Sequence, residues 1–291
     1  GIVGTFPALN QRDTAGFEAW VIEIKEALAE FEAETGKKAA PFGVNLIVHG
    51  TNPRVQADLE ICIKHKVPLI ITSLGAVPQL VEAVHSYGGL VFHDVIKKRH
   101  AEKAAEAGVD GLILVAAGAG GHAGLTNPMS LITEVKAFFD KTILLSGCIS
   151  TGNDIASALQ MGADLAYMGT RFINVDESLA DEEYKQMIID SNASDIVYTA
   201  AVSGVNANFL RPSLESMGIT EDMWAQTKKI DFGEELDAAQ AEAKAWKTIW
   251  SAGQGVTSID DSVSTTTLID RLKEQFVTAL RRQQEVLKKY L

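Results

Sequence analysis

The chain has 291 residues, of which 46% are hydrophobic and 22% are charged, and its formal net charge at pH 7 is −12. This composition is typical of a globular protein with enough apolar material for a sizeable core. Nucleic acids and anionic membranes are bound through clustered Lys and Arg, so the negative charge and the lack of a basic stripe exclude both as partners.

The cysteine and histidine patterns exclude two further classes of protein. Cys62 and Cys148 are the only cysteines and form no CxxC pair, and the six histidines show no HExxH or other close grouping. A disulfide framework and a metal site are therefore not expected. No apolar run reaches the roughly 18–20 residues of a membrane span, and no signal peptide is recognisable, so we expect a cytoplasmic protein.

Seven short apolar runs alternate with longer helical stretches in the first part of the chain. Each run is almost continuously apolar, as expected for a strand that is buried on both faces. This alternation predicts parallel strands joined by crossover helices. In chain order the predicted strands are Gly1–Phe6, Phe42–Val48, Pro68–Ser73, Leu90–Val95, Gly111–Ala116, Thr142–Ser146 and Asp164–Met168.

The number of strands favours an α/β fold of the (β/α)8 type, the TIM barrel. Seven units are one fewer than the barrel needs, and the chain begins without Met inside the first apolar run. We therefore predict a TIM barrel whose first βα unit is absent from this chain. An open, doubly wound sheet of seven strands is the alternative.

The alternating pattern ends near residue 175. We expect a parallel βα barrel over residues 1–175 and a helical cap or insertion over residues 176–263, which includes an irregular loop at Asp195–Arg211. Residues 264–291 are expected to form a C-terminal helix that packs on the barrel.

The loop after the fifth strand, Gly118–Gly124 (GAGGHAG), carries the first candidate functional residue. Its glycines allow the backbone to approach a flat ligand, and they leave His122 little to pack against. An imidazole that titrates near pH 7 at the carboxyl end of a strand is suited to act as a base or hydrogen-bond donor. A surface histidine is the alternative. A Rossmann site is not expected, because the next helix begins only after Asn127.

The next two strands both end in glycine-containing turns, Ser146–Asp154 and Tyr167–Arg171. Phosphate groups bind at such turns on the last two strands of barrels, so the pair predicts a phosphate site. Thr151 is expected to cap the following helix, whose amino terminus would also favour an anion. Cys148 lies inside the first turn, where a contribution from its backbone is favoured over a role as a nucleophile.

Two strands carry polar residues inside apolar runs. Asn45 contacts either a ligand or a structural hydrogen-bond partner, because burying an amide without partners is costly. His93 either lines the substrate pocket or is a buried side chain with its own partner, and Ser203 is a second candidate for the pocket. Lys97 and Lys98 would suit a Schiff base, but adjacent lysines beside an arginine more often face water.

At these positions the chain resembles the nitronate monooxygenase family, formerly called 2-nitropropane dioxygenases. The resemblance covers almost the whole chain, and the order of the glycine–histidine loop and the two phosphate turns makes it specific to this superfamily. It is carried by Gly1–Phe6, Gly43–Asn45, Val91–Val95, Ala117–Gly124, Ser146–Ile149, Met168–Phe172 and Trp250–Gly255.

The resemblance implies a TIM barrel that binds FMN beneath a helical cap. It places the FMN phosphate on Gly147, Cys148, Gly169 and Thr170, places Asn45 near the flavin, and adds Gly120, Gly121, Ser146 and Met168 to the expected cofactor contacts. His122 would act on the nitroalkane or nitronate as a base or hydrogen-bond partner. The substrate would then give electrons to FMN, and dioxygen would reoxidise it.

The chain also departs from the family. Members often carry an acidic residue in place of Gly118 and an arginine in place of Ala123, and both positions concern the substrate side of the pocket. The family's first strand, which supplies flavin contacts, lies outside this chain.

We therefore predict FMN-dependent oxidation of small nitronates or nitroalkanes by dioxygen. The enzyme alternative is an FMN-dependent enoyl-thioester reductase that uses NADH or NADPH. Such reductases have a similar glycine–histidine loop. The third alternative is a barrel that binds a flavin or a phosphate without turnover. The physiological substrate and the formation of a homo-oligomer are left open.

Overall fold

The computed structural model describes residues 2–202, 204–224 and 249–291. Within these ranges, contacts between residues define two compact units. The first unit contains residues 2–95 and 99–112, and the second contains residues 96–98, 113–202, 204–224 and 249–291. The expected division into barrel, cap and C-terminal helix remains a prediction.

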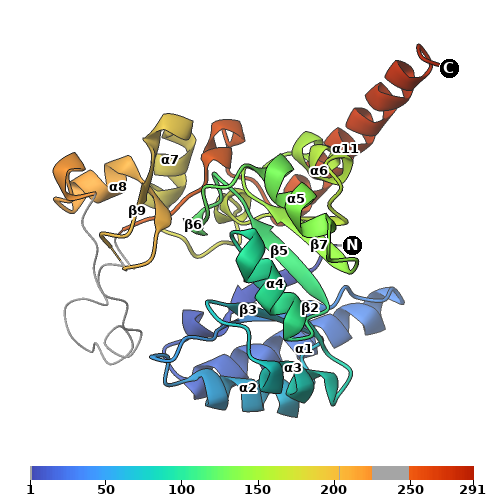
Figure 1. The fold of residues 1–291 in the computed structure, drawn as a ribbon, viewed down its shortest axis with the longest axis vertical. Coiled ribbons are helices and arrows are strands. Elements are labelled where there is room, and N and C mark those ends of the chain that lie inside the picture. The colour runs from blue at the N-terminus through green and yellow to red at the C-terminus, as the bar shows by residue number, and fades with distance from the viewer. Residues whose placement is uncertain (1, 203, 225–248) are drawn as a thin grey trace. The chain divides into compact units, whose positions relative to one another are not determined.

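All seven predicted strands are present, each within three residues of its expected ends (Figure 1). They follow one another in the order β1-β2-β3-β4-β5-β7-β8. The pairs β1–β2, β2–β3, β3–β4 and β7–β8 are parallel, as the alternating pattern predicted. The strands are β1 Gly4–Pro7, β2 Phe42–Ile47, β3 Leu69–Ser73, β4 Leu90–Val95, β5 Gly111–Val115, β7 Thr142–Ser146 and β8 Leu165–Tyr167.

The described part of the chain is thus an α/β protein with a mainly parallel seven-stranded sheet. A closed eight-stranded barrel is a finer statement that remains a prediction. No helix within the described ranges is long and apolar enough to cross a membrane.

In the first unit, helices α1 (Thr14–Thr35), α2 (Val55–Lys64) and α3 (Pro78–His85) lie along one face of strands β1 to β4 (Figure 1). Helix α4 (Lys98–Glu106) follows β4. Asp13 caps α1 by accepting from Gly16 N at 2.7 Å, and Gly36 ends it at a φ of 63°. Arg54 is the N-cap of helix α2.

In the second unit, the predicted helix starts are confirmed. Asn127 caps α5 (Pro128–Lys136), and Thr151 caps α6 (Gly152–Gln160) in a capping box with Asp154. The C-terminal helix α11 (Thr265–Leu287) packs against α6. A Cβ built on Gly152 would lie 2.2 Å from the carbonyl oxygen of Leu272, so the two helices approach this closely only because residue 152 is glycine.

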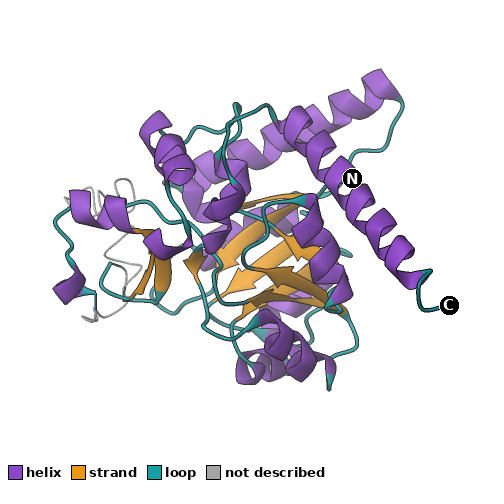
Figure 2. Cartoon of the chain, turned by 90° about the horizontal axis from the view of Figure 1, so that it is seen from above, coloured by secondary structure: helices purple, strands orange, loops and turns teal. Residues whose placement is uncertain are grey.

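The expectation of an irregular loop at residues 195–211 is wrong. This stretch forms β9 (Ile196–Thr199) and β10 (Ala207–Leu210), which pair antiparallel, and helix α8 (Arg211–Ser216) follows. Strand β10 also pairs with β6 (Gly121–His122), which gives a small three-stranded sheet (Figure 2). Helix α7 (Glu182–Asp190) precedes the hairpin. The hairpin was missed because its strands are short and are stabilised by a partner far away in the sequence.

Candidate active site

The glycine loop after β5 contains two positions that require glycine. Gly118 has a φ of 83° and Gly121 a φ of 68°, in the left-handed region that side chains disfavour. A Cβ on Gly118 would also lie 2.4 Å from Cys148 Sγ and 2.8 Å from Gln254 Oε1. An acidic residue at position 118, as the family often carries, would therefore be strained in this chain and would require Cys148 or Gln254 to move.

His122 lies on a strand rather than in a free loop. Residues Gly121 and His122 pair with Asn208 and Ala207 of β10. The side chain of Asn208 is buried and donates to Ala119 O at 2.6 Å. These contacts fix the backbone on which the imidazole is carried.

The imidazole of His122 is partly buried, and its Nε2 atom is shielded from solvent. The expectation that the neighbouring glycines leave His122 little to pack against is therefore wrong, because the side chain is partly buried. Burial lowers the pKa of His122, since the charged imidazolium loses its hydration. At neutral pH the ring is uncharged and can accept a proton.

The two glycine turns predicted to bind phosphate are neighbours. Strands β7 and β8 are paired through Ser146 and Tyr167, so the turns that follow lie at the same edge of the sheet. Gly147 has a φ of 123° and Cys148 a φ of 56°, which turns the chain sharply after β7.

Four backbone N–H groups in these turns are available to a ligand. Among the described residues, no turn or cap hydrogen bond is donated by the backbone N–H of Gly147, Cys148, Gly169 or Thr170. A Cβ built on Gly169 would meet no atom within 4 Å, so there is open space beside the second turn. Several N–H donors around an open space suit a phosphate oxygen, and the residues therefore fit the phosphate of FMN.

The amino terminus of α6 does not contribute in the way the sequence suggested. Ser150 N and Thr151 N both donate to Asp154 Oδ2, at 3.0 and 2.8 Å. Gly152 N donates to Gln275 Oε1 of helix α11 at 2.9 Å. Because the protein itself satisfies these donors, the turns are better candidates for an anion site than the helix terminus.

The glycine–histidine loop and the two turns lie in direct contact. A Cβ built on Gly147 would lie 3.2 Å from Ala117 O, and a Cβ built on Gly120 would lie 3.1 Å from Thr170 Oγ1. Within the second unit, the three segments that the sequence singled out therefore meet at one place.

Residues 250–255 (WSAGQG), which contributed to the family resemblance, join these segments. Gln254 N donates to Gly118 O at 2.8 Å, and Gly121 N donates to Ser251 Oγ at 2.8 Å. Gly253 N donates to Thr170 Oγ1 at 3.0 Å, which leaves the hydroxyl proton of Thr170 for another acceptor. This segment thus links the loop that carries His122 to the second turn.

Sequence reasoning missed three residues that support the loop. Tyr198 Oη donates to Ala123 O at 3.1 Å, and Tyr184 donates to Ser251 O and stacks on Trp250 with ring centroids 5.1 Å apart. The third is Asn208. Its sequence signal was weaker than that of Asn45, because the stretch Val205–Leu210 (VNANFL) contains two amides rather than one inside an apolar run.

Cys148 is a protonated thiol with weak contacts. Its Sγ lies 3.8 Å from Ala117 O and 3.9 Å from Gln254 Oε1. Burial and the nearby charge of Asp154 raise its pKa, so the thiolate needed for nucleophilic attack is disfavoured. This supports the expectation that the backbone of Cys148 matters more than its sulfur.

The remaining predicted residues of the second unit have structural contacts. Ser146 is paired with Tyr167 in the sheet, and the side chain of Met168 packs in an apolar cluster with Leu268 and Leu272. Any contact of Met168 with a phosphate would therefore involve its backbone. Ser203 lies outside the described residues.

The polar strand residues of the first unit point to two faces. Asn45 bonds to Ser73, and Ser73 bonds to Asp94. His93 is 5% exposed and its Nδ1 lies 2.7 Å from Thr72 Oγ1. Burial lowers the pKa of His93 to about 4, so the ring is neutral. These features match the buried structural alternative for His93, and Lys97 and Lys98 are exposed to solvent as expected.

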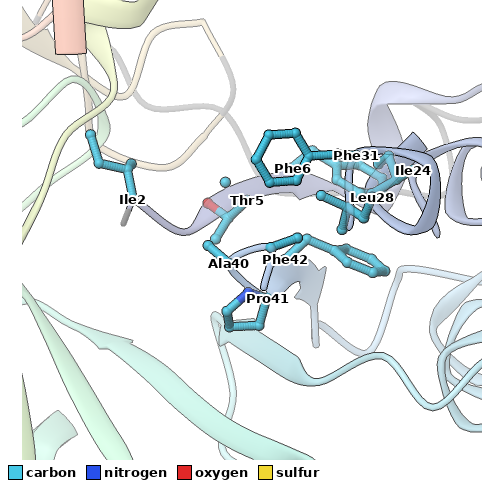
Figure 3. A pocket seen from close by; sticks show the side chains of 11 residues that line it. Ile2, Thr5, Phe6, Ile24, Leu28, Phe31, Ala40, Pro41 and Phe42 are labelled. Carbon is cyan, nitrogen blue, oxygen red and sulfur yellow. The ribbon is translucent and has the colours of Figure 1, made fainter. Parts of the chain in front are cut away.

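The first unit also has an apolar cavity of about 530 Å³ beside β1 and α1 (Figure 3). Phe6, Phe31 and Phe42 line it together with aliphatic side chains, and Thr5 is the only lining residue with a side-chain hydroxyl. Such a lining lacks the convergent polar groups that catalysis requires. The cavity is therefore not part of the candidate active site.

Comparison with known proteins gives consistent matches. The sequence model of the nitronate monooxygenase family matches residues 5–275. A nitronate monooxygenase of Pseudomonas aeruginosa is 26% identical over 211 residues, which are 69% of this chain and 58% of that protein. The chain also matches two relatives from Mycobacterium tuberculosis and one from Rhodococcus jostii, and it spans 53–66% of the length of these three proteins.

Two solved structures resemble the fold. FabK from Thermotoga maritima is 26% identical with a TM-score of 0.70, and the match covers 93% of this chain and 85% of FabK. A nitroalkane oxidase from Streptomyces ansochromogenes is 21% identical with a TM-score of 0.75, and the match covers 97% of this chain and 90% of the oxidase. At this identity the match shows a similar fold and no more. The sheet and these matches define an α/β protein with two neighbouring glycine turns. The chain belongs to the nitronate monooxygenase family.

Proposed function

We propose that this chain binds FMN and oxidises small nitronates, and nitroalkanes more slowly, with dioxygen as the electron acceptor. The proposal includes a (β/α)8 barrel to which this chain contributes seven strands, and a cytoplasmic location. The observation that carries it is the contact between the two glycine turns and the loop that bears His122. Membership of the family supports the choice of reaction.

In this proposal the residues of the turns bind the cofactor and His122 acts on the substrate. The N–H groups of Gly147, Cys148, Gly169 and Thr170 would hold the FMN phosphate, and the free hydroxyl proton of Thr170 would add a donor. The bound flavin would take electrons from the substrate and pass them to dioxygen. The predicted contact of Asn45 with FMN is retained as part of the proposal.

His122 would handle the proton of the substrate. A neutral nitroalkane must lose a proton from the carbon next to the nitro group, and the uncharged imidazole can accept it, leaving the electron pair on the nitronate. A nitronate has already lost this proton. For that substrate His122 would serve only as a hydrogen-bond partner of the anion.

Binding of FMN is tested by adding FMN to the cofactor-free chain and measuring quenching of flavin fluorescence. Saturable quenching at a ratio of one FMN per chain is expected. Anaerobic mixing of the loaded protein with propionate 3-nitronate should then bleach the flavin absorbance near 450 nm, and admission of air should restore it. An absorbance that nitronate leaves unchanged would contradict the proposed reaction.

The role of His122 is tested by His122→Asn. This variant should retain FMN and lose at least about 100-fold in turnover of neutral nitroethane, the usual contribution of a general base. Turnover of ethyl nitronate should fall much less. Ser86→Ala, on the exposed end of helix α3, is a matched control. Equal losses on both substrates would refute the assignment of His122 as a base.

The structural match to FabK favours a second candidate, an FMN-dependent enoyl-thioester reductase that uses NADH or NADPH. The same anaerobic experiment separates the two reactions. Rapid bleaching of the flavin by NADH or NADPH alone, followed by reoxidation with an enoyl thioester, would select the reductase. Bound FMN that neither nitronate nor nicotinamide reduces would indicate a flavin-binding protein without turnover.

A further inference from the structure

The C-terminal half of helix α11 carries a narrow stripe of residues that the chain leaves exposed. They recur at alternating spacings of three and four, which is the a and d pattern of a coiled coil. We call them the heptad stripe: Val277, Leu280, Gln284 and Leu287. The three apolar members are 36–55% exposed, and Gln284 is exposed as well. The same spacing continues to Leu291, just past the end of the helix.

The heptad stripe is not the face with which α11 packs on α6. Gly152 of α6 lies against the backbone of Leu272 and Phe276, and Gln160 Nε2 donates to Gln283 Oε1 at 2.9 Å. Among the described residues, this is the last hydrogen bond from α11 to another element. In Figure 1 the helix continues past α6 toward the C-terminus. The stripe is therefore available to a partner.

The shape of the stripe indicates which kind of partner fits. A helix that packs on a globular core presents a broader apolar face, whereas a stripe of a and d positions alone fits one other helix. A helical segment that packs against nothing gains little stability by itself. A second helix along the heptad stripe would remove its leucines from water and stabilise the end of α11.

The flanking residues determine the direction of that second helix. Arg281 and Lys288 are at e positions, and Gln283 and Tyr290 are at g positions. If the second helix is another α11 and runs parallel, each e position faces a g position, so each basic side chain meets an uncharged one. In an antiparallel pair e faces e, and basic side chains would repel one another across the contact.

Gln284 favours the same arrangement. Parallel pairing of two copies brings each a position beside the same a position, so two Gln284 side chains can donate to and accept from each other. Antiparallel pairing brings an a position beside a d position. Gln284 would then face a leucine and would lose its hydration without gaining a hydrogen bond.

We propose that the heptad stripe is a homodimer interface, in which α11 of a second copy packs parallel to the first. Each member of the stripe meets its own counterpart across a twofold axis, as a self-complementary interface requires. The contact extends over about three helical turns, which is less than the interface of a tight dimer. The association should therefore be weak and should depend on protein concentration.

Sedimentation velocity of the whole chain between about 1 and 500 µM tests the association. The wild type should change from monomer to dimer over this range. Leu287→Asp should weaken dimerisation at least about 30-fold, the effect of removing a residue that carries much of a binding energy.

Val286→Asp is the matched control, because Val286 is also apolar and 48% exposed but lies at the outer c position. It should leave dimerisation unchanged, and circular dichroism should show both variants folded. A chain that is monomeric throughout, or equal dimerisation of the two variants, would overturn the proposal.

A disulfide reports the direction of the helices without a destabilising charge. In the parallel dimer the two copies of residue 277 lie side by side, whereas in an antiparallel pair they would be at least about 15 Å apart along the helix axis, too far for a disulfide. Air oxidation of Val277→Cys should link two chains through position 277, which peptide mass spectrometry identifies. Thr278→Cys, at the outer b position, should form no such link. Absence of the link in Val277→Cys, or equal linking in Thr278→Cys, would overturn the parallel dimer.

Discussion

Replacement of Gly118 by alanine tests whether the glycine loop is packed as tightly as the structure shows. The φ of 83° at this position costs an alanine about 1–2 kcal/mol. The added Cβ would lie 2.4 Å from Cys148 Sγ and 2.8 Å from Gln254 Oε1, so a neighbour must move. Overpacking of this kind costs about 1–3 kcal/mol. We therefore expect Gly118→Ala to lower the free energy of unfolding by about 2–5 kcal/mol.

A second substitution divides this loss between its two causes. Cys148→Ala removes the sulfur atom, so the steric part of the cost should shrink while the backbone part is unchanged. In the Cys148→Ala background, Gly118→Ala should thus cost about 1–2 kcal/mol less than in the wild type, a coupling that a double-mutant cycle measures.

Equilibrium unfolding in urea gives all four free energies, and loss of far-ultraviolet circular dichroism is the signal. Gly4, which has no atom within 4 Å of its Cβ position, provides the matched control Gly4→Ala. A cost of less than about 0.5 kcal/mol for Gly118→Ala would refute the packing argument. An equal cost in both backgrounds would show that Cys148 is not the obstacle.

Two further predictions concern the turns and the first unit. Gly169→Ala should leave the urea midpoint of unfolding unchanged, because open space surrounds its Cβ position. The added methyl group should fill that space and weaken FMN binding at least about fivefold. An unchanged affinity for FMN would mean that the phosphate binds elsewhere. Asp94→Asn should stabilise the chain at pH 8 by up to about 3 kcal/mol, because the pKa of Asp94 is about 6 in the folded chain and 3.8 ordinarily. The cost of burying the charged carboxylate is fully present above pH 6 and absent below about pH 4, where the group is protonated. Urea unfolding at both pH values checks this, and a gain of equal size at pH 4 would show that burial of the charge is not its cause.

The sequence by itself determined the strands, the starts of helices α5 and α6, and the positions of the three candidate segments. Short apolar runs between helical stretches predict buried parallel strands from local pattern alone, and caps such as Asn127 and Thr151 involve residues only two or three positions away. The glycine turns after β7 and β8 were also predictable, since they follow directly from where the strands end.

Only the tertiary structure decided how those segments are used. His122 lies on a strand because β10, some 85 residues further along the chain, pairs with it. The amino terminus of α6 is not available to an anion because Gln275 and Asp154 occupy its donors, and the first of these lies 123 residues away. Local sequence patterns carry no information on which distant residue satisfies a given donor, and such long-range partners decide which donors of the candidate anion site remain available.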